Sequence, residues 1–219
     1  TVSNIIMICV DSLRRDRLHF YGYPMNTTPF LSKYFNDCYK FNAVSPSTWT
    51  PSVMASVFSS LYPWEHKVLK DKEGQLVERY NVSSAALLLF KDYHKVCITS
   101  NPWLHPMFNL PKDFDEIEYV SDSWCGDSLN QTLLNTIKKL KTNNNLFFLH
   151  YMDVHEPYDK EFKDRVNIDL LKEIHKDYLN EDLKESEEKK QWSLMEENIY
   201  YLSSIFKVDH FISNTLSIL

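Results

Sequence analysis

Residues 4–10 read Asn4-Ile5-Ile6-Met7-Ile8-Cys9-Val10, and Asp11 follows them directly. This run is apolar at nearly every position, which is typical of a strand buried on both faces within a parallel sheet. Ligands of open α/β sheets gather at the carboxyl ends of strands, so Asp11 stands where a functional acid is expected. The alternative for Asp11 is a solvated turn residue.

Further along the chain, apolar runs alternate with amphipathic segments. Strands are predicted at residues 95–99 and 146–152, and helices at 29–38, 51–60, 84–91, 127–140 and 192–216. This alternation predicts an α/β fold with a mostly parallel sheet, in a single domain spanning residues 1–219. Residues 160–190 are densely charged and are predicted to form a helical insertion or lid, with a solvated helical excursion as the alternative.

The segment Thr48-Trp49-Thr50-Pro51-Ser52 precedes small and apolar residues. A hydroxyl followed by proline is typical of a helix start, so a hydroxyl cap by Thr50 is predicted for the helix at 51–60. The N-terminus of a helix also attracts anions through its N–H groups and dipole. Thr50 is therefore either a cap or an alcohol nucleophile aimed at a bound oxyanion. The segment at 27–29, Thr-Thr-Pro, likewise predicts a hydroxyl cap.

Composition excludes several functions. The net charge of the 219 residues is −6 and no basic block occurs, which argues against a nucleic-acid partner. With 3 glycines, no glycine-rich phosphate loop can be written. The 4 cysteines form no CxxC pair, so neither a disulfide framework nor a structural zinc site is expected. No signal peptide or membrane segment is found, which favours a cytoplasmic protein.

Several motifs together resemble the sulfatase family of the alkaline phosphatase superfamily. In chain order they are NIIMICVDSLRRD (4–16), YGY (21–23), TTPFL (27–31), WTP (49–51), AS (55–56), LYP (61–63), SNPW (100–103), DFD (113–115) and HYMDVHEPY (150–158). The resemblance implies a three-layer αβα sandwich. It also implies hydrolysis or transfer at a sulfate or phosphate ester of a small molecule, glycan or lipid.

The resemblance also assigns roles to residues. Asp11 matches an aspartate that binds a divalent metal, whether zinc, manganese, calcium or magnesium. Thr50 matches the nucleophile, which is bound to the same ion, and His155 matches a histidine that contacts the substrate oxyanion. Metal coordination would lower the pKa of the threonine hydroxyl and neutralise charge on the oxyanion. The alternative for His155 is a loop histidine bonded to nearby backbone.

Three further residues are predicted to contact substrate or to support the site: Arg14, Asn101 and Asp153. Each of them could equally be a turn or salt-bridge residue. If Asp11 and Asp153 are incidental, the chain would instead be an unrelated doubly wound protein.

Some positions depart from the family pattern. Thr50 cannot give the formylglycine of true sulfatases, Met54 replaces an arginine and Ser12 replaces a second aspartate. The family continues after the last helix into a strand that ends in an Asp-His-Gly motif with further metal ligands, so the domain of residues 1–219 is expected to be incomplete at its C-terminal end relative to the family. Asp209-His210 is the only Asp-His pair in the sequence, and its helical pattern predicts a surface position. An unmodified threonine resembles the phosphoryl-transferring branches of the superfamily. The alternative is a non-catalytic relative that keeps the fold as a binding or interaction module.

Overall fold

Four parallel strands form a sheet in the part of the chain that the structure describes. They are β1 (Ser3–Val10), β2 (His94–Thr99), β3 (Glu116–Tyr119) and β4 (Asn144–Tyr151), in the order β1-β4-β2-β3. The predicted strands at 4–10, 95–99 and 146–152 are confirmed. β3 was not predicted because four residues of alternating Glu-Ile-Glu-Tyr give too short a pattern to separate from a loop.

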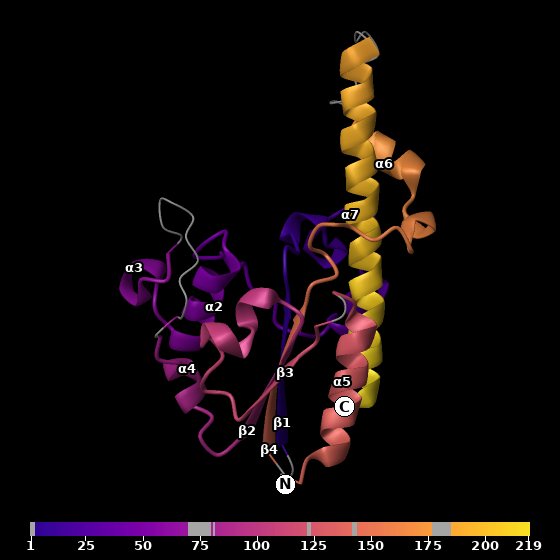
Figure 1. Ribbon diagram of the computed structural model, residues 1–219. Helices are drawn as coiled ribbons and strands as arrows, with labels where there is room; N and C mark the ends of the chain where they lie inside the picture. Colours follow the sequence, from indigo (N-terminus) through magenta and orange to yellow (C-terminus); the bar gives the residue numbers. More distant parts are fainter. Residues whose placement is uncertain (1–2, 70–79, 81, 122–123, 142–143, 177–184) are drawn as a thin grey trace. The chain divides into compact units, whose positions relative to one another are not determined.

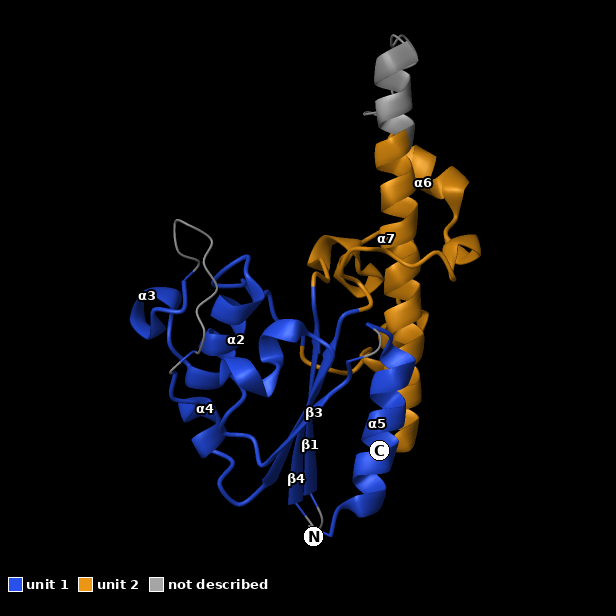
Figure 2. Cartoon of the chain, in the orientation of Figure 1, with its two compact units in different colours: residues 1–11, 40–152 blue, residues 12–39, 153–219 orange. Residues whose placement is uncertain are grey.

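The computed structural model describes residues 3–69, 80, 82–121, 124–141, 144–176 and 185–219, with side chains from residue 193 in the last segment. The chain forms two compact units (Figure 2). Unit 1 comprises residues 1–11 and 40–152, and unit 2 comprises residues 12–39 and 153–219. Among the described residues, no helix combines the length and the apolar character of a membrane span.

Unit 1 has helices on both faces of its sheet (Figure 1), which gives the predicted three layers. One face is covered by α2 (Thr50–Ser59) and α4 (Ala85–Leu88), and the other by α5 (Gly126–Lys139). Shorter pieces are α3 (Pro63–His66), η3 (Pro102–Leu104) and η4 (Pro106–Phe108). The helix predicted at 127–140 is confirmed by α5, whereas the one at 84–91 is reduced to the single turn of α4.

The core between α2 and the sheet contains a group of packed aromatic rings among aliphatic side chains. Phe58 of α2 packs edge-on against Phe148 of β4 with ring centroids 5.2 Å apart, and against Phe114 at 5.4 Å. On the opposite face, Leu129 and Leu133 of α5 are fully buried. The burial of these apolar side chains is the main favourable contribution to the packing of α2 and α5 on the sheet.

β1 differs from its prediction. Its apolar residues were expected to be buried on both faces, but Ile5 to Val10 are only half-buried. Within the described residues, β1 pairs with β4 on one side and lies at the edge of the sheet. The apolar pattern was read correctly as a strand, but a pattern carries no information on how many neighbours the strand has.

Unit 2 is built on the long helix α7 (Glu185–Ile218), which extends beyond the predicted helix at 192–216. Its buried stripe comprises Leu202, Ile205, Val208 and Ile212. Against it pack α1 (Pro29–Tyr34) and η5 (Lys163–Arg165); η1 (Arg15–Arg17), η2 (His19–Tyr21) and α6 (Ile168–Ile174) complete the unit. In the predicted charged insertion, the structure describes η5, α6 and the start of α7, and residues 177–184 lie outside the described part.

The prediction that Asp209 lies on the surface is wrong. Asp209 is 2% exposed, and its two carboxylate oxygens accept the N–H groups of Phe30 and Leu31 at 2.9 Å each. The predicted hydroxyl cap of α1 is also wrong, because Thr28 makes no side-chain cap bond and Asp209 caps this helix from α7 instead. Burial raises the pKa of Asp209, and the two N–H bonds partly offset this.

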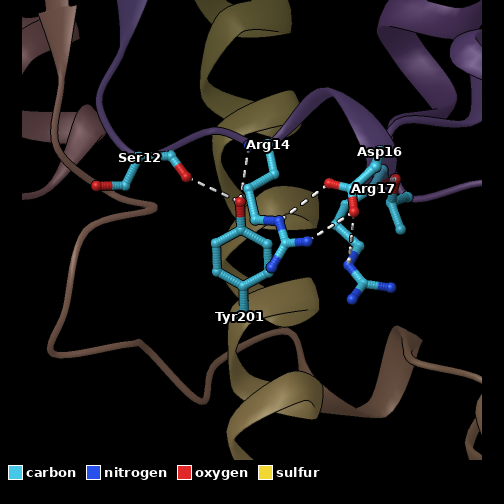
Figure 3. A network of polar contacts seen from close by, with 6 residues as sticks. Ser12, Arg14, Asp16, Arg17 and Tyr201 are labelled. Carbon is cyan, nitrogen blue, oxygen red and sulfur yellow. Dashed lines mark hydrogen bonds and ion pairs between the residues drawn. The ribbon is translucent and has the colours of Figure 1, made fainter. Parts of the chain in front are cut away.

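A tyrosine of α7 holds the loop that begins unit 2 (Figure 3). The hydroxyl of Tyr201 accepts the N–H of Arg14 and donates to the carbonyl oxygen of Ser12, each at 2.8 Å. Ser12 has a left-handed backbone with φ 60°, a conformation that is unfavourable for most residues without support. Burial raises the pKa of Tyr201 to about 12, so the phenol stays protonated and can keep donating.

Replacing Tyr201 with phenylalanine is expected to destabilise unit 2 by about 1–3 kcal/mol, because the change leaves a carbonyl and an N–H without their partner. The measurement is the free energy of unfolding in urea. Tyr200→Phe is the matched control, since Tyr200 bonds to the exposed Glu196 and its loss is expected to cost less than about 0.5 kcal/mol. Equal unfolding midpoints for the two variants would contradict the role of the Tyr201 hydroxyl.

Candidate active site at the carboxyl ends of β1, β2 and β4

Strand alternation places several polar side chains on the α2 face of the sheet. Asp11 lies two residues after Cys9, and His150 two residues after Phe148, both of which belong to the core under α2. Because side chains alternate along a strand, Asp11 and His150 share that face. β1 and β4 are paired in parallel with Cys9 opposite His150, so the two polar side chains lie at the same end of the sheet.

Thr50 meets Asp11 there. The Thr50 hydroxyl donates a hydrogen bond to Oδ2 of Asp11 at 3.1 Å. Thr50 is the first residue of α2 rather than its cap; the cap position is Trp49, which makes no side-chain cap bond. The predicted capping role is therefore wrong, and the hydroxyl is directed to the carboxylate instead. The predicted pairing of Asp11 with Thr50 is present in the structure.

Asn101 fixes the same carboxylate oxygen. Its Nδ2 donates to Oδ2 of Asp11 at 3.2 Å, while its Oδ1 accepts the N–H of Trp103 at 2.9 Å. The bond from Trp103 identifies which end of the amide faces Asp11. Asn101 is 2% exposed and caps η3. It therefore joins the turn after β2 to the carboxylate after β1.

His150 is the site residue that the sequence analysis missed. Its side chain is fully buried, with Nε2 3.6 Å from Oδ2 of Asp11 and Nδ1 3.5 Å from the hydroxyl of Thr99. A distance of 3.6 Å is too long for a hydrogen bond, and Nε2 is a buried nitrogen without a hydrogen-bond partner. The available signal was a single polar residue interrupting the apolar run Leu146-Phe147-Phe148-Leu149 before its end.

Burial sets the protonation of the groups around Asp11. It lowers the pKa of His150 to about 4, and the nearby Asp11 carboxylate only partly opposes this, so the ring is neutral at pH 7. Burial, assisted by Asp11, raises the pKa of Cys9 to about 12, so this thiol stays protonated, as a buried structural cysteine does.

A pH dependence of stability follows from His150. At pH values below 6.5, the ordinary pKa of histidine, His150 is protonated in the unfolded chain but stays neutral in the folded chain. Stability of the metal-free protein is therefore expected to fall as pH decreases from 6.5 to about 4, by up to roughly 3 kcal/mol. Urea unfolding across this range should show a flatter profile for His150→Gln than for the wild type. Equal profiles would contradict the assignment, and His94→Gln controls for loss of a histidine elsewhere.

The donor set at Asp11 fits a divalent ion in part. A carboxylate, a hydroxyl and a neutral imidazole nitrogen are all metal ligands. Among the residues that the structure describes, however, no three His, Cys, Asp or Glu side chains are grouped to hold a metal. The fit therefore depends on the hydroxyl of Thr50 acting as a ligand beside Asp11, as predicted.

Three other predicted site residues belong to unit 2. Arg14 makes two bonds to Asp16, with Nε at 3.0 Å and Nη2 at 2.7 Å (Figure 3), and both side chains are more than half exposed. Asp153 is buried, and Nδ1 of His155 lies 2.7 Å from the carbonyl oxygen of Glu156. Their predicted contacts with substrate stay predictions.

In α/β proteins, the carboxyl ends of parallel strands and the N-terminus of a helix are places where ligands and anions bind, and Asp11 and Thr50 meet at such a place. The family model for sulfatases matches residues 3–219, and the chain belongs to that family. No individual curated protein matches the sequence.

Solved structures with the same fold include the following three. The periplasmic domain of EptC from Escherichia coli, in complex with zinc, has 13% identity and a TM-score of 0.62 over 99% of this chain and 59% of that one. The phosphonate monoester hydrolase of Agrobacterium radiobacter has 13% sequence identity and a TM-score of 0.66, and the match covers 99% of this chain and 59% of that one. The putative sulfatase yidJ from Bacteroides fragilis has 14% sequence identity and a TM-score of 0.64, and the match covers 100% of this chain and 58% of that one. The chain thus spans about three-fifths of their length, and these likenesses show the fold.

Proposed function

We propose that the protein is a metal-dependent hydrolase or transferase of phosphate or sulfate esters in which Thr50 is the nucleophile. The observation that carries the proposal is the 3.1 Å bond between the Thr50 hydroxyl and Asp11, at the meeting point of α2 and β1. The substrate class would be a small-molecule, glycan or lipid ester. The cytoplasmic location stays a prediction.

In this mechanism Thr50 Oγ1 forms a bond to phosphorus or sulfur as the bond to the leaving ester oxygen breaks, and the leaving oxygen departs with the electron pair and takes up a proton from water. The hydroxyl proton is transferred to Oδ2 of Asp11, which already accepts it in a hydrogen bond. Asn101 holds that oxygen in place through its Nδ2. A bound divalent ion would lower the pKa of the hydroxyl and neutralise negative charge on the transferring group.

The N-terminus of α2 supplies a further stabilising element. Pro51 has no N–H, and the N–H of Val53 donates to the carbonyl oxygen of Trp49, so the first-turn donors available to an anion are those of Thr50 and Ser52. Together with the helix dipole, they favour an oxyanion beside the nucleophile. In unit 2, His155 remains the proposed contact to the substrate oxyanion, with Arg14 and Asp153 as proposed substrate contacts.

The test is turnover of p-nitrophenyl phosphate, bis-p-nitrophenyl phosphate and p-nitrophenyl sulfate with added zinc or manganese, using the longest natural form of the protein. We expect release of nitrophenol that depends on the added metal and stops with a chelator. Absence of turnover on all three substrates would count against the enzymatic function.

A second candidate is a non-catalytic member of the family that serves as a binding module. Two observations favour it: Met54 occupies a position where sulfatases carry an arginine, and no three His, Cys, Asp or Glu side chains are grouped to hold a metal among the described residues. Calorimetric titration with metal separates the two candidates. A protein that binds neither zinc nor manganese would support the binding module.

A further inference from the structure

The position of His150 suggests a function besides packing in the core. It is the one fully buried histidine recorded among the described residues, and its Nε2 has no hydrogen-bond partner. A buried polar atom without a partner costs free energy, typically about 1–3 kcal/mol. The His150 ring is stacked with that of Phe148, two residues earlier on the same face, with ring centroids 6.1 Å apart, and this contact does not involve Nε2 as a hydrogen-bond donor or acceptor. The unpaired nitrogen faces the Asp11 carboxylate instead of a core partner.

The distances around Asp11 match donors that share one ion. Oδ2 of Asp11 lies 3.1 Å from the Thr50 hydroxyl and 3.6 Å from Nε2 of His150. In a tetrahedral zinc site with ligand bonds of about 2.0–2.1 Å, neighbouring donor atoms are about 3.3–3.4 Å apart. The 3.6 Å between Oδ2 of Asp11 and Nε2 of His150 is too long for a hydrogen bond, but it is close to the distance between two ligand atoms of the same metal ion.

Resting on the proposed function, we propose that Nε2 of His150 is a third protein ligand, beside Asp11 and Thr50, of the divalent ion at this site. The neutral ring would carry its proton on Nδ1, which faces the hydroxyl of Thr99 at 3.5 Å, and Nε2 would offer its lone pair. The Thr99 hydroxyl is itself held by the N–H of Asn101 at 3.0 Å.

This ligand set also discriminates between metals. Imidazole nitrogen suits zinc, whereas calcium, magnesium and manganese prefer oxygen ligands. Of the four ions that the sequence left open, the geometry therefore selects zinc.

The test combines calorimetry with zinc or calcium chloride and nitrogen NMR on the whole chain. We expect the wild type to bind zinc more tightly than calcium, and His150→Ala to weaken zinc binding at least tenfold. His94→Ala is the matched control, because His94 lies at the opposite end of β2 and pairs with Glu116 at 2.9 Å. The zinc affinity of the His94→Ala variant should equal that of the wild type.

Side-chain ¹⁵N spectra of the wild type alone give a second readout, which holds even if His150→Ala does not fold. Zinc should shift the Nε2 resonance of His150 and leave that of His94 in place. Zinc binding that leaves the His150 resonance unchanged, or that is equal in the wild type and His150→Ala, would overturn this inference while the metal-dependent function stands. Equal weakening by His94→Ala would also overturn it. Failure of the wild type to bind any divalent metal would overturn both proposals.

Discussion

Replacing Thr50 with valine is expected to reduce turnover at least about 10³-fold, because valine keeps the size of the side chain and removes the attacking oxygen. The reduction should appear in kcat as well as in kcat/KM, since the lost group acts in the bond-forming step. The free energy of unfolding should fall by about 1 kcal/mol, because the Asp11 carboxylate loses the hydrogen bond from the Thr50 hydroxyl. Thr50→Ser keeps an alcohol at the same place and should retain measurable turnover.

The matched control for this variant is Thr132→Val on α5, whose hydroxyl only donates to the carbonyl oxygen of Ser128 in the same helix. Rapid acid quenching followed by intact-mass analysis gives an independent readout. A covalent phosphoryl or sulfuryl adduct should map to Thr50 in the wild type and be missing from the valine variant. Unchanged turnover in Thr50→Val would show that the nucleophile is another group.

Replacing Asp11 with asparagine should remove the negative charge at the centre of the site while preserving its shape. We expect zinc affinity to fall at least about 100-fold and turnover at least about 10³-fold, because the variant loses both a metal ligand and the acceptor of the Thr50 proton. Calorimetry measures the first effect and nitrophenol release the second. Since Asn101 donates to Oδ2 of Asp11, the introduced amide is expected to turn its nitrogen away from Asn101 and to keep an oxygen acceptor there.

The control is Asp92→Asn, which neutralises an exposed aspartate in the same unit before β2. It should leave metal binding and turnover unchanged. If Asp11→Asn binds zinc as tightly as Asp92→Asn, Asp11 is not a ligand, and the mechanism proposed above is wrong.

Part of the site could be predicted from local pattern alone. Asp11 and Asn101 directly follow or closely follow apolar strands, and parallel strands bring their carboxyl ends together. Thr50 precedes a proline and an apolar helix. Which of its two roles applies could not be decided, because a cap and a nucleophile occupy nearly the same position and only the direction of the hydroxyl separates them.

The buried polar residues were missed because a hydrophobic pattern locates apolar side chains and gives no information on the partners of a polar side chain among them. His150 lies inside a run of buried residues, and a run does not say whether a single polar member is paired. Asp209 lies four residues after Ile205 and three before Ile212, both buried. That spacing places Asp209 on the apolar stripe of α7, so its burial could have been inferred. Its partners on α1 are nearly 180 residues away in sequence and could not.

The position of β1 at the border of the described sheet has a practical consequence for handling the purified chain. Its outer backbone N–H and C=O groups, flanked by half-covered isoleucines, form a template on which an additional strand can hydrogen-bond. Unless another polypeptide segment occupies that template, self-association should increase with protein concentration, and light scattering should detect it before activity is lost.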